Sequence, residues 1–528
     1  MNDAFSTAGR LLLAAYLALL LSGCGRSPGA ADAVDEIRIA LAGDMRSTNP
    51  GVLRDANTDT VIHHVVESLV AYRDDLTVAP LLAQSFDVSE NGTVYTFRLR
   101  RDVRFHNGEP MTSSEVKWSW QRMLDPDTGW RCRHWYDGSS DKGTEVLAVE
   151  TPDPFTVVFR LAEPGSSFLD RMANVQCVTA VLHPDSLDEQ GNWAGPVATG
   201  PYVIERWQRG EYILLRRFAQ YQPRPEPRDG YAGGRQALTE RVRFVIVPEV
   251  ASGVAAIAAG DLDVIAQVPP YLAGELGANG ALRLYEQELL DWSTLLINGT
   301  DPLLEDPRMR HAIAHALDPR QIAAASTFGT ARPNSSAVPL LSPFHTEVHD
   351  RWWPYDAEEA KRLLELAGYD GQPIRIQTNR KFPVDFDNAI AVQAMLTAVG
   401  INAPLEVVDW ATQLSDYYSH TFQLSSFGYS ARTHPVLNYD TILGLRERKP
   451  SVQWEDRRAL QLLDRAERTY DRTEQTRIFE ELHLLMMQEV PIIGLFNDST
   501  LDVTRASIEG YRPWPLANPR LWGVRKGR

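Results

Sequence analysis

Short segments in which apolar and polar residues alternate recur along the chain, beginning at residues 37–41. Alternation predicts β-strands, because successive side chains of a strand point to opposite faces of a sheet. Residues 94–100 show the pattern clearly, with β-branched and aromatic residues at most positions. The predicted strands are 37–41, 94–100, 156–161, 203–207, 212–217, 242–247, 374–378, 405–408 and 491–496.

Segments with helical signals lie between these strands. Thr112 and Glu115 fit a capping box, in which the hydroxyl accepts from a free N–H group of the first turn and the glutamate reaches back to another. The predicted helices are 112–124, 250–259, 306–317, 356–368 and 389–399, with one or two more over 455–488. Because strands and helices alternate, the fold class is α/β or α+β.

The N-terminal region carries an eleven-residue apolar run, Leu11–Leu21, which is followed by Ser22, Gly23 and Cys24. Such a run is too short to span a bilayer and has the length of a signal-peptide core. The sequence Leu21-Ser22-Gly23-Cys24 resembles a bacterial lipobox, in which the cysteine is acylated. We therefore expect a signal peptide over 1–23 and a lipidated tether over 24–34. The alternative is an ordinary signal peptide with an incidental cysteine; either way the mature chain is expected outside the cytoplasm.

Composition narrows the class of protein. The 528 residues predict roughly two to four domains. Hydrophobic residues make up 44% and charged residues 23%, as in soluble globular proteins. The formal net charge of −16 makes a nucleic-acid partner a poor expectation. No later apolar stretch approaches about 18 residues, so we expect membrane contact through the lipid anchor only.

Three cysteines are present, an odd number for an exported protein. If Cys24 carries lipid, Cys132 and Cys177 remain, and an exported compartment permits a disulfide between them. Closing that loop would stabilise the fold by roughly 3–4 kcal/mol on a chain-entropy view. The alternative is two separate buried thiols.

Motifs of catalysis and metal binding are absent or incomplete. The sequence has no G-x-S-x-G, H-E-x-x-H or G-x-x-x-x-G-K-[ST] motif. Ser114 with Lys117 and Ser139 with Lys142 match S-x-x-K but lack the partner motifs of that chemistry. His311 and His315 have metal-ligand spacing on a helix but no evident third ligand nearby. We therefore expect a protein that is not an enzyme and that holds no cofactor or metal.

Five motifs in order resemble one family. Residues 91–112 resemble the signature of the extracellular solute-binding proteins of family 5, the oligopeptide- and dipeptide-binding components of ABC importers. Residues 199–202 (TGPY), 306–318, 360–369 and 400–410 resemble further family motifs in the same sequence order. The resemblance covers nearly all of the chain from residue 37 to 520.

The resemblance implies an α/β periplasmic binding protein fold of class II, with two lobes around a ligand cleft and an extra domain. Lobe I would be discontinuous and comprise 35–77, 199–292 and 497–528. The extra domain would be 78–198, and lobe II would be 293–496. The lobes of such proteins close on the solute about a hinge. The resemblance also implies a monomer.

The resemblance also points to a ligand-binding turn at residues 428–432. The family places an acid at the position of Arg432, after an aromatic residue that is Tyr429 here and a small residue that is Ser430. In the oligopeptide-binding branch an arginine takes the position of Ser426. An acid at position 432 would bind a peptide's ammonium group, whereas an arginine attracts an anion.

Two interpretations of this departure stay open. The anchor acid has moved, with Asp55 beside Arg54 as the candidate; or the solute is not an ordinary peptide, and Arg432 binds a carboxylate or phosphate. A third alternative is that Arg432 faces solvent or pairs with an acid of the other lobe.

The resemblance implies further ligand-facing residues: Trp410, Tyr417, Phe496 and Asn497. For Trp410 the alternative is packing in the core.

The resemblance therefore implies a lipid-anchored periplasmic protein that captures peptides or peptide-like solutes and delivers them to the permease of an ABC transporter. One alternative is a binder of a non-peptide anion, such as a sugar phosphate, a muropeptide or a metal chelate. Another is a sensing or envelope lipoprotein on the same fold. Gly25 follows Cys24 where aspartate would favour inner-membrane retention, so either membrane stays open.

Overall fold

The computed structural model describes residues 35–139 and 143–527. The predicted signal peptide, the tether and Cys24 lie outside these residues. Within the described part of the chain, no helix has the length and apolar character needed to cross a bilayer.

One sheet of 11 strands runs through the whole molecule. Its order is β15-β14-β16-β12-β17-β11-β1-β10-β9-β8, and β13 pairs with β17 outside this path. The strands are β1 (Glu36–Leu41), β8 (Tyr202–Gln208), β9 (Tyr212–Arg217), β10 (Arg241–Ile246), β11 (Val264–Val268), β12 (Leu282–Ile297), β13 (Arg332–Pro333), β14 (Ile376–Thr378), β15 (Leu405–Val407), β16 (Leu424–Tyr429) and β17 (Ile492–Arg505). β1 lies parallel to β10 and β11, and β14 lies parallel to β15 and β16; the remaining pairs are antiparallel.

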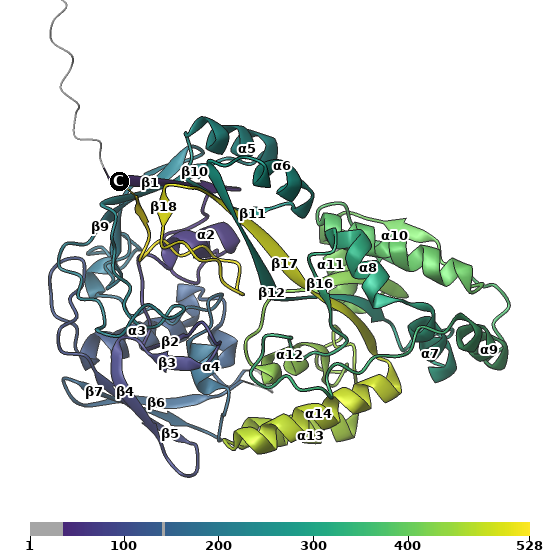
Figure 1. The fold of residues 1–528 in the computed structure, drawn as a ribbon. Coiled ribbons are helices and arrows are strands. Elements are labelled where there is room, and N and C mark those ends of the chain that lie inside the picture. Colours follow the sequence, from purple (N-terminus) through teal and green to yellow (C-terminus); the bar gives the residue numbers. More distant parts are fainter. Residues whose placement is uncertain (1–34, 140–142, 528) are drawn as a thin grey trace, which may run out of the picture.

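The long strands β12 and β17 join the two lobes. They pair antiparallel from Leu282↔Arg505 to Leu296↔Ile492 and cross the centre of the molecule in Figure 1. At one end β17 pairs with β11 of the first lobe, and at the other β12 pairs with β16 of the second. The expected strand over 491–496 is therefore too short, because β17 continues to Arg505 on partners from both lobes. The predicted lobe boundaries fall inside this pair, at Trp292↔Asn497.

Helices cover the two lobes. The first lobe carries α2 (Ala56–Ile62), α5 (Val250–Ala259) and α6 (Ala273–Gly277). The second carries α7 (Pro307–Ala316), α8 (Pro319–Thr327), α9 (Ala357–Ala367), α10 (Pro383–Ala398), α11 (Trp410–Ser419), α12 (Pro435–Ile442), α13 (Arg457–Arg468) and α14 (Arg472–Glu489). Helix α10 begins six residues before the predicted start at Ala389, with Pro383 in its first turn. The region 455–488 forms two helices, because Asp471 caps the second.

The segment between the first-lobe elements forms a smaller antiparallel sheet, β4-β5-β7-β6, and a short ribbon, β2-β3. These strands are β2 (Val70–Tyr72), β3 (Val78–Pro80), β4 (Ala83–Val88), β5 (Val94–Leu99), β6 (Val146–Asp153) and β7 (Thr156–Leu161). Its helices are α3 (Ser113–Leu124) and α4 (Phe168–Met172). As the sequence predicts, Thr112 and Glu115 form both hydrogen bonds of a capping box at the start of α3.

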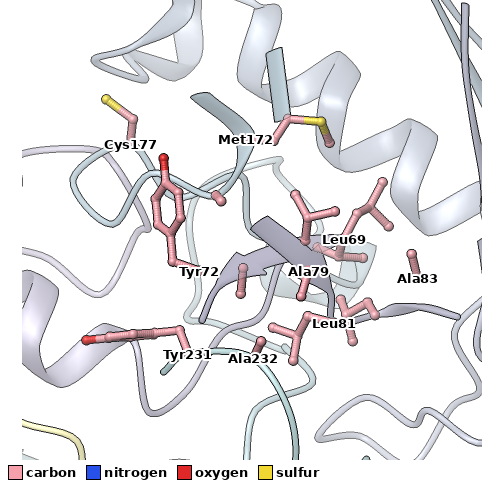
Figure 2. Packing of buried hydrophobic residues seen from close by; sticks show 14 of the residues in the cluster. Leu69, Tyr72, Ala79, Leu81, Ala83, Met172, Cys177, Tyr231 and Ala232 are labelled. Atoms are coloured by element: carbon pink, nitrogen blue, oxygen red, sulfur yellow. The ribbon is translucent and has the colours of Figure 1, made fainter. Parts of the chain in front are cut away.

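The core of this region joins distant parts of the chain. Leu69, Tyr72 and Leu81 around the ribbon β2-β3 are buried with Met172 and Tyr231, as Figure 2 shows. The Tyr72 hydroxyl donates to the backbone oxygen of Asp170 at 2.7 Å and accepts from Thr433 of the second lobe. The ribbon β2-β3 therefore contacts Asp170 of the small-sheet region and Thr433 of the second lobe through one side chain, Tyr72.

Candidate functional site

The turn after β16 lies where the two lobes meet. β16 pairs with β12 from Ile297↔Leu424 to Trp292↔Tyr429, so its last residues lie beside the crossing point of β12 and β17. Gly428 and Ser430 are exposed, and the ring of Tyr429 stacks on Trp292 with centroids 6.1 Å apart. A cavity of about 10 Å³, with Trp292, Tyr429, Ser430 and Arg432 among its lining residues, lies under this turn. That volume holds about one water molecule.

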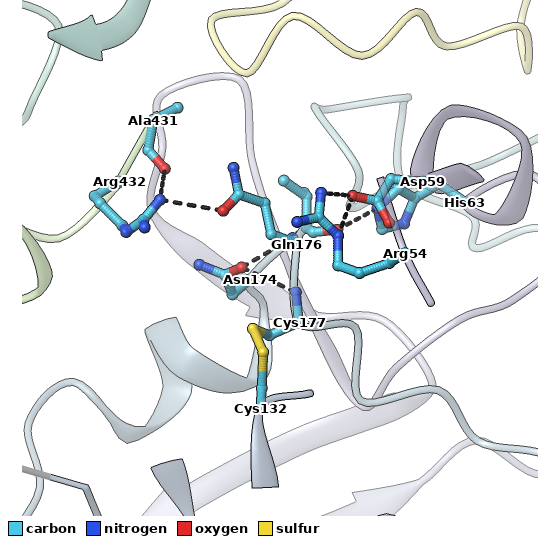
Figure 3. The surroundings of a disulfide bond; sticks show 10 residues. Arg54, Asp59, His63, Cys132, Asn174, Gln176, Cys177, Ala431 and Arg432 are labelled. Carbon is cyan, nitrogen blue, oxygen red and sulfur yellow. Dashed lines mark hydrogen bonds and ion pairs between the residues drawn. A yellow bond between two sulfur atoms is a disulfide. The ribbon is translucent and has the colours of Figure 1, made fainter. Parts of the chain in front are cut away.

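Arg432 links the second lobe to the extra domain. Its Nη1 donates to Gln176 Oε1 at 3.1 Å and to the backbone oxygens of Ser430 and Ala431 at 3.2 and 3.0 Å, as Figure 3 shows in part. The side chain is half-buried. Burial lowers the pKa of Arg432, and the negative charge of Asp291 opposes that shift. Among the described residues only Nη1 has hydrogen-bond partners, so the rest of the guanidinium fork is available to an anion.

A disulfide holds the loop that contacts Arg432. Cys132 and Cys177 are bonded, with Cα atoms 5.8 Å apart (Figure 3). In the same loop, Asn174 Oδ1 accepts from the N–H groups of Gln176 and Cys177. The His63 ring of the first lobe lies 2.7 Å from the backbone oxygen of Val175. Residues 174–177, the bridging loop, therefore touch His63 of the first lobe and Arg432 of the second.

Arg54 and Asp55 have partners at the start of α2. Asp55 is the N-cap: its Oδ1 accepts from the backbone N–H and the hydroxyl of Thr58 at 2.8 and 2.7 Å. Arg54 forms an ion pair with Asp59, with Nε 2.8 Å from Oδ2. Burial raises the pKa of Asp59 to about 6, and the hydrogen bond from Arg54 acts against that shift. One Asp55 oxygen is thus used by the helix cap, which reduces its capacity to anchor a ligand.

The predicted aromatic residues pack on one another. Tyr417 stacks on Phe427 with ring centroids 4.7 Å apart, and Trp410 lies 5.7 Å from the same ring. Phe427 also contacts Tyr429 at 5.3 Å. Tyr417 is buried, whereas Trp410 and Tyr429 are half-buried. The aromatic stripe therefore leaves Trp410 and Tyr429 partly accessible beside the turn.

Phe496 and Asn497, which the resemblance places facing the ligand, are both fully buried in this structure. Asn497 Nδ2 donates to the backbone oxygen of Asp291 at 3.1 Å. Its Oδ1 accepts from Asn334 Nδ2 at 2.8 Å and from the N–H of Leu340 at 3.1 Å. These contacts make Asn497 a link between strand β17 and its neighbours.

Three acids near the turn were missed by the sequence analysis. Asp291 lies on β12 and accepts from the N–H of Ala431 at 3.1 Å. Asp498 lies on β17 and accepts from the Ser293 hydroxyl at 3.0 Å. Asp385 lies buried in the first turn of α10. For Asp291 and Asp498 the available signal was an acid within a long strand-forming segment, LLDWSTLLI and IIGLFNDST, whereas Asp385 lies in a helix and had no such signal.

The electrostatics of these acids are linked. Burial raises the pKa of Asp291 to about 6, although the Ala431 N–H and Arg432 oppose the shift. Burial and then the charge of Asp291 raise the pKa of Asp498 well above its ordinary value, and Asp385 adds to the effect. Burial also raises the pKa of Asp385 to about 7, against the effect of the Asn379 side chain. A cation beside them would favour their charged forms.

A separate cavity of about 440 Å³ lies between the extra domain and helices α12 and α13. Its walls carry charges of both signs, including Glu163, Arg171, Asp440 and Glu467. It contains none of the predicted site residues. Over residues 35–139 and 143–527, no group of three or more His, Cys, Asp or Glu side chains is arranged to hold a metal ion.

Comparisons with known proteins agree with this architecture. Over 492 residues the chain is 23% identical to the glutathione-binding protein GsiB of Salmonella choleraesuis, covering 91% of this chain and 92% of GsiB. It is 29% identical over 363 residues to a putative ABC transporter peptide-binding protein of Brucella ovis, covering 67% of this chain and 64% of that protein.

The fold also matches solved structures. The periplasmic binding protein DppA of Helicobacter pylori, solved with the peptide STSA, superposes with a TM-score of 0.77 at 22% identity, over 93% of this chain and 98% of DppA. Residues 77–444 match the family described as bacterial extracellular solute-binding proteins, family 5 Middle. The chain belongs to the bacterial extracellular solute-binding proteins of family 5.

Proposed function

We propose that this protein captures a peptide or peptide-like solute between its two lobes and delivers it to the permease of an ABC importer. The observation that carries the proposal is the pairing of opposite charges where the lobes meet. Arg432 provides guanidinium donors. Asp291 on β12 accepts from the N–H of Ala431, the residue before Arg432, and Asp498 provides a second carboxyl group on the neighbouring strand β17. A zwitterionic solute presents the complementary pair, and charge-assisted hydrogen bonds are about twice as strong as neutral ones.

The shared sheet supports a hinge mechanism. Only β12 and β17 connect the first-lobe strand β11 to the second-lobe strand β16 in the sheet order. Their ladder is irregular between Glu288 and Trp292 and again between Ser293 and Thr294. Bending there would move one lobe against the other while most ladder hydrogen bonds remain, as in hinge closure of two-domain binding proteins. Closure removes the solute from water and strengthens its polar contacts.

Relatives give independent support for a peptide-like solute. GsiB is named for glutathione, a short peptide-like compound with one ammonium group and two carboxylates, and the Brucella protein is named as a peptide-binding protein. The capture step involves no bond making or breaking, so no catalytic group is required. The proposed solute is thus small, zwitterionic and bound by charge at both ends.

We further propose that Cys24 is lipidated and that the residues after it tether the fold to a periplasmic membrane surface. Expressing the full precursor and a Cys24→Ser variant in a Gram-negative host tests this. The native protein should fractionate with membranes and incorporate labelled palmitate, while the variant should lose the label. Equal labelling of both would contradict the proposal.

Binding measurements test the capture proposal. Melting temperature is recorded with a pool of tripeptides and, separately, with sugar phosphates. The proposal predicts that the tripeptide pool raises the melting temperature, because binding to the folded state stabilises it by mass action. Native mass spectrometry of protein purified from its host should then show a retained peptide-sized adduct. A shift with sugar phosphates and none with tripeptides would contradict it.

A non-peptide anion is the second candidate, and Arg432 is the observation that favours it. Its partly accessible guanidinium suits a carboxylate or phosphate, and its hydrogen-bond acceptors within the described chain are all neutral. The sugar-phosphate arm of the same experiment decides between the two.

A further inference from the structure

We propose that Asp385 and Asp498, with Asp291 adding negative charge nearby, bind a primary ammonium group of the solute. The inference rests on the proposed capture of a peptide-like solute and gives the position of its positive end. It moves the cation-binding role away from Asp55, whose carboxylate caps α2.

Three neighbouring strands and one helix bring these groups to one face of the sheet. The Ser293 hydroxyl of β12 donates to Asp498 of β17 at 3.0 Å. On its other side Ser293 lies opposite Gly428 of β16. A Cβ atom placed on Gly428 would lie 3.6 Å from Asp385 Oδ1, so Asp385 reaches this face from helix α10. The order across the sheet is therefore Asp498, Ser293, Gly428 and Asp385.

Gly428 keeps the space in front of Asp385 open. It is exposed, and Asp385 Oδ1 is the one atom within 4 Å of the position where its Cβ would lie. Any larger side chain at position 428 would extend from that position toward the carboxylate. The absence of a side chain thus leaves room for a small group next to Asp385.

Unsatisfied polar groups lie on the same side of the sheet. Side chains two residues apart on a strand share a face, so Ser426 lies on the face of Gly428. Ser426 is fully buried, and its hydroxyl has no hydrogen-bond partner among the described residues. Asn388 lies one turn after Asp385 on α10, is fully buried, and has no partner in the described chain for either amide atom.

Such buried polar atoms are costly unless something satisfies them. An ammonium group has three N–H donors and needs several acceptors at once. The Ser426 hydroxyl and the Asn388 amide oxygen can accept such hydrogen bonds alongside the carboxylates.

The charges around Asp498 also favour binding of a cation. The charged groups that act on Asp498 are Asp291 and Asp385, both acidic, and no cation is among them. Arg432 is the cation that acts on Asp291, and its Nη1 is already held by Gln176 and two carbonyl groups. Like charges at close range are unfavourable until a cation joins them. A ligand ammonium would relieve that repulsion.

An organic cation fits better than a metal ion. Ca²⁺ takes six to eight oxygen ligands at short range, and Mg²⁺ requires near-octahedral geometry. The three carboxylates do not converge in that way, since the described residues contain no metal-binding group of acids. An ammonium group has three donors, so two carboxylates and one neutral oxygen satisfy it without three converging acids.

Thermal shift titrations at pH 7.5 test the site with two tripeptide pools, one with free amino termini and one N-acetylated. The proteins are the native chain, Asp498→Asn, and Asp370→Asn as a charge-matched control on an exposed turn of the same lobe. A third arm uses 1,4-diaminobutane, which offers ammonium groups without a peptide. We expect the free pool to bind at least tenfold more tightly than the acetylated pool. Asp498→Asn should lose at least tenfold in affinity, and Asp370→Asn should lose none.

The outcomes separate the two proposals. Equal binding of both pools with no loss in Asp498→Asn would overturn the ammonium site while peptide capture stands. If diaminobutane binds, Asp498→Asn abolishes that binding, and no peptide binds, the ammonium site is supported and the proposed peptide-like solute is contradicted. No binding in any arm would overturn both. If Asp498→Asn does not fold, Gly428→Ala replaces it, because its added methyl group reduces the space beside Asp385 and should weaken the free pool at least threefold.

Discussion

At the scale of single residues, opposite charges meet without neutralising one another. Asp291 is held by the N–H of Ala431, and Arg432 by the carbonyl groups of Ser430 and Ala431. Backbone groups therefore orient both side chains, and the two side chains form no direct ion pair with each other. A preorganised pair of this kind loses little conformational entropy when a ligand binds.

Arg432→Ala should lower affinity for the bound solute at least tenfold, about 1.4 kcal/mol, because the guanidinium is proposed to bind its anionic end. Calorimetry on the native protein, Arg432→Ala and the exposed control Arg375→Ala measures this. Gln176→Ala separates the roles of Arg432. If Gln176→Ala loses as much affinity as Arg432→Ala, the arginine acts by bridging to the extra domain and not by contacting the solute.

Affinity for peptides with free amino termini should rise with pH between about 5 and 7.5. The ligand-free pKa is about 6 for Asp291 and about 7 for Asp385, so protons occupy these acids at low pH and an ammonium must displace them. Arg432 is the facing cation, and it stays charged throughout this range. Titrations at several pH values should show a smaller slope for Asp385→Asn. A flat profile for the native protein would contradict this account.

The same acids affect stability with the opposite sign. Their pKa values are raised on folding from an ordinary value near 4, so the folded state binds more protons than the unfolded state between about pH 4 and 7. Their contribution to stability is therefore present at low pH and is lost as pH rises through that window.

At the scale of elements, the bridging loop connects the disulfide to the ligand-binding turn. Cys177 fixes one end of the loop, Asn174 organises its backbone, and Gln176 contacts Arg432. A constraint on the loop is therefore transmitted to a residue of the second lobe. We therefore expect the disulfide to affect both the stability of this region and the position of Arg432.

Removing the disulfide should lower the free energy of unfolding by roughly 3–4 kcal/mol, because it closes a loop of 45 residues. Urea denaturation of the native protein and the double variant Cys132→Ser, Cys177→Ser measures the difference. A reducing agent should destabilise the native protein and leave the double variant unchanged. Affinity should also weaken if the loop positions Arg432; equal affinity in both proteins would show that it does not.

Local elements could be predicted from the sequence, and the site only in part. The capping box of α3 and the glycine end of α9 depend on neighbouring residues, so their signals lie within a few positions. Asp291, Asp385 and Asp498 come together only through strand pairing and helix packing across distant segments. The burial of Phe496 and Asn497 depends on β12 and β13, which pair with β17 on its two sides, and neighbouring residues in the sequence do not reveal those partners.

At the scale of the whole molecule, the lobes are two ends of one sheet joined through β12 and β17. The extra domain contacts both, through the bridging loop and through the Ser166 N–H, which donates to the backbone oxygen of Glu467 at 2.8 Å. A change in lobe position would therefore also shift contacts of the extra domain.

Solute binding should reduce the radius of gyration, which is about 24 Å for a compact chain of this length. Small-angle scattering with and without a saturating tripeptide pool measures this. Arg432→Ala at the same pool concentration serves as the unbound reference. An unchanged radius in the native protein at saturation would show that binding does not require lobe closure.

The pairing of Leu296 with Ile492 has a consequence for how the protein can vary. The segment between them adds β13, β14, β15 and β16 to the same sheet, and its two ends are neighbours. An inserted segment whose ends are adjacent can be exchanged as a unit, provided that the replacement keeps the strands that pair with β12 and β17. The loops and helices of the second lobe that lie off this sheet can therefore vary in length and sequence while the first lobe keeps its structure.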